Sequence, residues 1–301
     1  VTLSLSRLIT SLNHGAFFGL GAIVAASVVP AGKQASAIAA MFMGLTIAGI
    51  GGVPLVTKIT QLIGWREAFY LISGIGLLTI ASLIFAIPAH LQGSQVNVKN
   101  ELRILRRPLV MLGMLSTVLG ASAMFTLYTF ITPMLMNIIQ ASDQTITMML
   151  MVIGVGFSIG NYLGGYFADK NLYPTLLTLF VLSAISMVIF PIIATNIAGA
   201  TVGLLFWSIV SFALVPPIQI LVMNAAVGAQ ALASSVNIGA FNLGNAIGAA
   251  VGAAILSHGY SYTTMSFMGA LLAIVGFIVI LLIVRRKNSE TQTQDVMCSA
   301  N

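Results

Sequence analysis

The chain has 301 residues, of which 58% are hydrophobic and only 6% are charged, and its mean hydropathy is +1.05. In a typical soluble domain about a quarter of the residues are charged. Eighteen charged side chains cannot cover a water-exposed surface of this size, so soluble enzymes, nucleic-acid-binding proteins and disordered tails are excluded. The composition therefore predicts an all-α integral membrane protein.

Nine apolar stretches are long enough to cross a bilayer, because a spanning helix needs about 20 residues. They cover residues 3–28, 35–56, 67–88, 108–138, 145–167, 174–195, 198–222, 232–257 and 262–284. The more polar segment 89–107 predicts a cytoplasmic linker between two bundles, one within residues 1–88 and one within residues 108–284. Residues 285–301 are expected to form a cytoplasmic tail.

Basic residues orient these spans, since Lys and Arg in short loops gather on the cytoplasmic side of a membrane. The outer side of the predicted bundle holds Lys58 and Arg66. The other side holds nine basic residues, namely Lys33, Lys99, Arg103, Arg106, Arg107, Lys170, Arg285, Arg286 and Lys287. With the C-terminal tail in the cytoplasm, an odd number of spans places Val1 on the outer side. Because an outer N-terminus is unexpected without a signal peptide, we expect further spans in the intact protein.

An internal repeat indicates how many spans to expect. The segment that begins at Gly32 aligns without gaps with the segment that begins at Gly228, at an offset of 196 residues, and six spans separate the two. Two six-span units in the same orientation are a known plan of transporters. On this plan residues 108–284 form a complete six-helix bundle, residues 1–88 hold the last three helices of another, and three more precede Val1 to make twelve.

The first predicted span carries a polar stripe. Arg7, Ser11, His14 and Phe18 lie within about 40° of one another on one helix face. An arginine in a span costs from about 2.5 kcal/mol upward and by default faces a cavity or a partner, although Arg7 could instead snorkel to the interface. His14 could exchange protons near neutral pH or could be a packing residue. The stripe predicts coupling roles for Arg7 and His14 and cavity positions for Ser11 and Phe18.

Small residues form faces on several spans that would let helix backbones approach closely. Packing is the main prediction for these glycines, with sliding or rocking at an interface as an indirect consequence. In the second span they are Gly44, Gly49, Gly51 and Gly52, followed by Pro54; in the eighth they are Gly244, Gly248 and Gly252; and in the fifth they are Gly156, Gly160 and Gly164.

Aromatic and polar side chains in three later spans predict the wall of a ligand cavity. Ordinary membrane cores and interhelical hydrogen bonds use the same residue types, so packing is the alternative. In the seventh span the double proline Pro216–Pro217 removes two helical hydrogen bonds and predicts a kink. The candidates are Phe125, Tyr128, Thr129 and Thr132 in the fourth span, Gln219 in the seventh, and Asn237, Phe241 and Asn245 in the eighth.

No acidic residue lies deep within the nine predicted spans, and the sequence contains neither an HExxH motif nor a phosphate-binding loop. These absences disfavour a membrane-embedded enzyme and an ATP-driven pump, and no metal or cofactor is expected. A coupling carboxylate would then lie upstream of Val1 or be replaced by His14. In the segment GGYFADK, Asp169 with Lys170 could cap a neighbouring helix or could be a solvated turn.

Several segments together resemble the major facilitator superfamily, and within it the bacterial drug and arabinose efflux permeases. RLITSLNHGAFFGLGAIVAAS resembles the fourth-helix motif, and GLTIAGIGGVPL, followed by GWREAF, is similar to the fifth-helix antiporter motif. FTLYTFITPML, PPIQILVMNAA and FNLGNAIGAAVG resemble the seventh, tenth and eleventh helices. GGYFADK resembles the loop motif after the eighth helix, but only Gly165, Asp169 and Lys170 carry over, because NLYP follows without the usual Gly and basic pair.

The resemblance implies two six-helix bundles around a central site, with alternating access coupled to protons. It predicts a monomeric secondary transporter of the bacterial inner membrane, with its C-terminus in the cytoplasm. Its partners would be protons, the bilayer and a small organic solute such as a sugar, nucleoside or drug, which it would export. An importer or facilitator of the same fold and an inactive truncated remnant are the alternatives.

Overall fold

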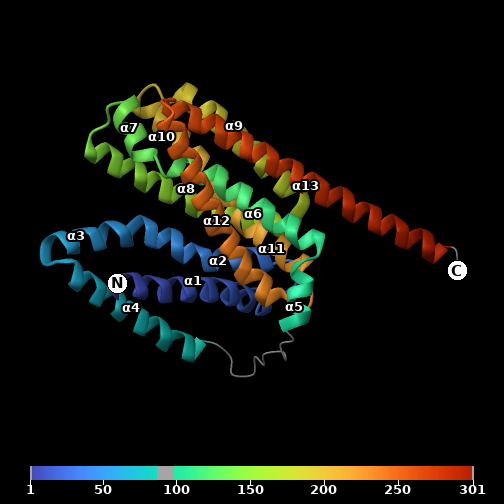
Figure 1. The fold of residues 1–301 in the computed structure, drawn as a ribbon. Coiled ribbons are helices and arrows are strands. Elements are labelled where there is room, and N and C mark those ends of the chain that lie inside the picture. The colour runs from blue at the N-terminus through green and yellow to red at the C-terminus, as the bar shows by residue number, and fades with distance from the viewer. Residues whose placement is uncertain (1, 87–97, 300–301) are drawn as a thin grey trace.

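The computed structural model describes residues 2–86 and 98–299, of which 2–12, 53–54, 57–58, 61, 86, 98 and 288–299 are described by their backbone alone. All the described elements are helices (Figure 1). Those of the first half are α1 (Thr2–Ser27), α2 (Gln34–Ile47), the π-helical turn η1 (Ala48–Gly52), α3 (Val53–Ile63) and α4 (Trp65–Ala86). The second half contains α6 (Pro108–Tyr128), α7 (Ile131–Ile138), α8 (Asp143–Lys170), α9 (Leu172–Ile193), α10 (Ile197–Ala213), α11 (Val215–Ala225), α12 (Gln230–Ser257) and α13 (Tyr262–Ser299).

The nine predicted spans coincide with these helices. Eight described stretches are long and apolar enough to cross a membrane, and each matches one predicted span. The remaining predicted span, 3–28, corresponds to α1, a helix of 26 residues. The predicted linker 89–107 contains a short helix, α5 (Val98–Leu105), and the predicted tail continues the last span as the long end of α13 (Figure 1).

Prolines break two of the spans into consecutive helices. The span Ile197–Ala225 consists of α10 and α11, which meet at Leu214 just before Pro216 and Pro217, where the sequence predicts a kink. The span Pro108–Ile138 consists of α6 and α7. Pro133 has no backbone N–H, so the carbonyl of Thr129 loses its helical partner at this break.

Glycines let the helices of the second half approach closely. At Gly160 a Cβ atom would collide with the backbone of Ile209 in α10, and at Gly164 it would collide with the backbone of Ala213. Along α12, Gly244 lies against the backbone of Val118 in α6. The glycine faces of the fifth and eighth predicted spans therefore pack helices, as the small-residue spacing indicates.

The second span differs from this expectation. A Cβ atom at Gly44, Gly49 or Gly51 would meet nothing within 4 Å among the described residues, and one at Gly52 would meet only the nearby Ala48. Within the described part of the chain, the prediction that these glycines pack against another helix is therefore wrong. The run AGIGG is instead wound as the π-helical turn η1, which widens the helix locally. The side chain of Pro54, which follows at the start of α3, lies outside the described residues.

Two helix pairs form most of the contact between the halves: α1 packs on α12, and α2 packs on α8, with α11 also touching α2 and η1 touching α8. We call these contacts the seam. We call the end of the molecule where α1 ends and α2 begins, next to Lys33, the basic end. Gly19 of α1 lies directly against Ser235 of α12, and Gly165 of α8 lies against Ala39 of α2. A buried cluster spans the halves with Ala22, Ala26, Ala35, Ile38, Phe42, Ala168, Ile220, Met223 and Ile238.

Candidate functional site

A cavity lies between the two halves, on the side of the seam away from the basic end. Its empty space, with the open mouth and its solvent included, is about 670 Å³. Side chains from α1, α2, α6, α10, α11 and α12 line it, so both halves contribute to the wall. A change in the packing of the halves would therefore change the shape of the cavity.

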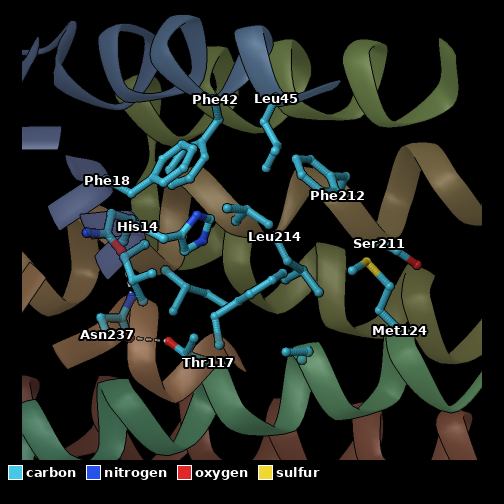
Figure 2. Close-up of a pocket in the computed structure, with 17 residues that line it drawn as sticks. His14, Phe18, Phe42, Leu45, Thr117, Met124, Ser211, Phe212, Leu214 and Asn237 are labelled. Atoms are coloured by element: carbon cyan, nitrogen blue, oxygen red, sulfur yellow. Dashed lines mark hydrogen bonds between the residues drawn. The ribbon is translucent and has the colours of Figure 1, made fainter. Parts of the chain in front are cut away.

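Apolar and aromatic groups form most of this wall (Figure 2). Phe18 of α1 and Phe42 of α2 stack with ring centroids 5.4 Å apart and planes 7° apart. The His14 imidazole lies 4.8 Å from the Phe18 ring and faces the cavity. Met124 and Phe212 supply apolar surface from the second half. Such a wall suits a ligand with an apolar body.

A few polar side chains interrupt the apolar surface. Asn237 Nδ2 donates a hydrogen bond of 2.7 Å to Gln219 Oε1, and Thr117 Oγ1 donates one of 2.6 Å to Asn237 Oδ1 (Figure 2). All three residues are buried and line the cavity. Buried amides are costly unless they are hydrogen-bonded, and these amides are paired with one another.

Five of the predicted site residues line the cavity. They come from spans that lie far apart in the sequence, and the fold brings them to one wall. They are His14, Phe18, Gln219, Asn237 and Phe241. The side chains of Arg7 and Ser11, which the sequence places on the same stripe as His14, lie outside the described residues.

Other cavity candidates lie elsewhere. Tyr128 lies one helical turn after Met124 on the same face of α6. Its ring stacks on the ring of Trp207, with the two centroids 6.3 Å apart. Phe125 contacts Phe241 edge to face, with the ring centroids 5.8 Å apart, and is not among the lining residues. Neither Phe125 nor Tyr128 lines this cavity, so their predicted place in its wall is wrong for this cavity; the Tyr128 ring packs on the buried Trp207 instead. Thr129, Thr132 and Asn245 also lie outside the lining.

Several lining residues have no distinctive sequence signal. Phe42, Leu45, Thr117, Met124 and Phe212 lie in apolar runs and are brought to the cavity by tertiary packing. Another residue of this kind is Ser211, whose buried hydroxyl has no hydrogen-bond partner among the described atoms. A bound ligand or a water molecule could satisfy this hydroxyl.

Asp169 closes the seam at the basic end. Its carboxylate accepts hydrogen bonds from the backbone N–H groups of Ala35, at 2.8 Å, and Ser36, at 2.9 Å, in the first turn of α2. The start of a helix attracts negative charge, because its first N–H groups lack helical partners. Lys170 instead lies over the Tyr166 ring, 4.3 Å from its centroid. The last residues of α8 thus cap a helix of the other half, and we call this contact the latch.

Further polar contacts follow the same seam away from the latch. Asn161 of α8 donates to the backbone carbonyl of Ala39, and Ser158 donates to Thr46 Oγ1 at 2.8 Å. The described hydrogen bonds between α2 and α8 therefore extend from the basic end toward the middle of the helices.

Comparison with known proteins gives a consistent result. A family model described as Major Facilitator Superfamily matches residues 1–237. Inner membrane transport protein YdhP of Escherichia coli (strain K12) is 50% identical over 301 residues, which is all of this chain and 76% of that protein. Putative transporter AraJ of the same strain is 31% identical over 300 residues, 98% of this chain and 75% of that protein. A crystal structure of FucP, an MFS transporter in the outward conformation, has the same fold: TM-score 0.69, 15% identity, covering 88% of this chain and 71% of that one.

Proposed function

The chain belongs to the major facilitator superfamily, and from this premise we propose that it exports a small organic solute in exchange for protons by alternating access. Its relatives and its fold are those of membrane transporters and not of enzymes. The observation that carries the proposal is the cavity, because both halves line it and the seam lies on one side of it.

The basic end is proposed to face the cytoplasm, which would place the C-terminus there as well. Lys33 and Lys170 flank the latch at this end, and basic loops gather on the cytoplasmic side. The latch and the seam would then hold the cytoplasmic end closed while the cavity is reached from outside. The name of YdhP supports an inner-membrane location.

His14 is proposed to carry the coupling proton, with Arg7 as its helper on the same helix. Among the described lining residues, His14 is the one with an imidazole, a side chain that can both accept and release a proton. It lines the cavity beside Phe18 and is exposed among the described residues, so both a solute and water could reach it. A solute and a proton that compete for one site would be exchanged across the membrane in opposite directions.

Export is the proposed direction because the segment from Gly44 to Leu55 resembles an antiporter motif. The test is the intracellular accumulation of a panel of labelled sugars, nucleosides and amphipathic dyes in cells with and without the protein. We expect expression to lower the accumulation of at least one compound, and a protonophore to abolish the effect. Higher accumulation on expression would contradict export and support an importer.

Replacing His14 by glutamine should remove the coupling and leave the fold intact, because the amide retains polarity but takes up no proton. We expect efflux driven by an imposed pH gradient to fall by about 100-fold or more, the lower end of what a proton-transfer group contributes. Exchange of labelled for unlabelled solute without a gradient should persist. His258→Gln, at an exposed site after α12, is the control. Unchanged gradient-driven efflux in His14→Gln would contradict the role of His14.

A further inference from the structure

A chain of hydrogen bonds leads from the cavity wall into the seam. We propose that this chain, the amide relay, couples the state of the seam to the hydrogen-bonding groups that the cavity presents, with Ser234 as the positioning residue. Only the identification of the ligand as the transported solute rests on the proposed function. The four bonds run from Thr117 Oγ1 to Asn237 Oδ1, from Asn237 Nδ2 to Gln219 Oε1, from Gln219 Nε2 to Ser234 Oγ, and from Ser234 Oγ to the Gly19 carbonyl.

The last bond is the one that joins the halves. Ser234 is fully buried at the start of α12, and its hydroxyl donates at 2.8 Å to the backbone oxygen of Gly19 in α1. Gly19 also lies in direct contact with Ser235, so α1 and α12 are as close here as their backbones allow. Separating the two helices must therefore break the bond between Ser234 and Gly19.

One proton sets the direction of the whole relay. A serine hydroxyl has a single proton, and because Ser234 gives it to Gly19, the hydroxyl can only accept from Gln219. The amide nitrogen of Gln219 must then point toward Ser234, which leaves its oxygen toward Asn237. Asn237 in turn must offer its nitrogen to Gln219 and its oxygen to Thr117.

Opening of the seam would reverse this order. Once Gly19 moves away, the Ser234 proton is free to be donated to the Gln219 oxygen, and both amides can turn over. Thr117, Gln219 and Asn237 line the cavity, whereas Ser234 does not. The cavity would thus present one pattern of donors and acceptors with the seam closed and another with it open. A solute with polar groups on an apolar body would distinguish the two patterns, which is what coupling of binding to a conformational change requires.

The test measures opening of the seam without a solute or an ion gradient. Cys298, the single cysteine of the sequence, is replaced by serine, and Ala22, which is 0% exposed in the cluster across the halves, is replaced by cysteine. The rate at which N-ethylmaleimide modifies this thiol in the purified protein reports how often α1 leaves α12. Because the readout does not depend on transport, it can fail or succeed independently of the proposed function.

We expect Ser234→Ala to increase the modification rate about fivefold to tenfold, the effect of losing one net hydrogen bond. Thr117→Val should also increase it, by about threefold, although Thr117 lies at the far end of the relay and does not touch the seam. The double variant should be modified no faster than Ser234→Ala, since both changes interrupt one chain.

Ser266→Ala is the matched control, because it removes a fully buried hydroxyl that has no partner among the described atoms. Its modification rate should equal that of the parent. Ser234→Thr retains the hydroxyl and should restore most of the protection. An unchanged rate in Ser234→Ala would overturn the proposal. The proposal would also be overturned if Ser234→Ala increased the modification rate and Thr117→Val left it unchanged, because Ser234 would then be a local contact and not part of a relay.

Discussion

Replacing Asp169 by alanine is expected to open the basic end of the seam and to lower transport at least tenfold, while the protein still inserts and folds. The carboxylate accepts two backbone hydrogen bonds from the first turn of α2. Hydrogen bonds to charged groups contribute about 1.5–3 kcal/mol each, and the half-buried site reduces this, so the closed state would lose roughly 2 kcal/mol. That loss corresponds to a shift of about 30-fold toward the open state.

Asp169→Asn should have a smaller effect, because its amide oxygen can still accept a hydrogen bond but carries no charge. Asp143→Asn is the control on the same helix, since Asp143 is exposed in the first turn of α8, at the opposite end from the latch. To measure the opening, Lys33 and Asn171, two exposed positions that flank the latch, are replaced by cysteines and spin-labelled in a variant that lacks Cys298. The distance between the two labels, the latch distance, reports how far the end of α8 lies from the start of α2. A short separation that persists in Asp169→Ala would show that the latch does not hold the seam closed.

Gly165→Ala is expected to separate α8 from α2, which makes it the second large effect. A Cβ atom at this position would lie 2.7 Å from Ala39 Cβ and 2.9 Å from the carbonyl oxygen of Ala35, both in the other half. These atoms belong to a helix backbone and a methyl group, so no flexible side chain can move aside. We expect the latch distance to lengthen and transport to fall by about tenfold or more, since overpacking costs about 1–3 kcal/mol.

Two other glycines separate this effect from a general loss of stability. A Cβ atom at Gly239 in α12 would meet nothing within 4 Å. Gly239→Ala should therefore leave both transport and the melting temperature nearly unchanged. Gly160→Ala collides with the backbone of Ile209 within the second half and should lower the melting temperature. If Gly165→Ala lowers the melting temperature as Gly160→Ala does without lengthening the latch distance, its role is structural and the interpretation is wrong.

The membrane helices could be predicted because a span is a local property. About 20 consecutive apolar residues suffice to define one, and the nine predicted stretches coincide with described helices. The break near Pro216 also follows from a local rule. The π-helical turn at Ala48–Gly52 could not be predicted, since glycine spacing alone does not distinguish close packing from a widened turn.

The candidate site was predictable only where a polar or aromatic residue interrupts an apolar face. His14, Gln219 and Asn237 stand out in this way and do line the cavity. Tyr128 stands out equally, but its ring stacks on Trp207 and does not line the cavity. The spacing of residues along one helix carries no information about such a neighbour. Thr117 is separated from Asn237 by 120 positions, so its place in the wall depends on tertiary packing alone.

The central claim is that the halves move against each other across the cavity, and the distance between labels at Lys33 and Asn171 tests it most directly. The protein is measured in lipid vesicles with a proton gradient in either direction, and with its gradient dissipated. We predict two distance populations, a short one with the latch closed and a longer one with it open, whose proportions change with the gradient in the parent but not in His14→Gln. A single short distance under every condition in which the protein transports solute would contradict alternating access at this seam.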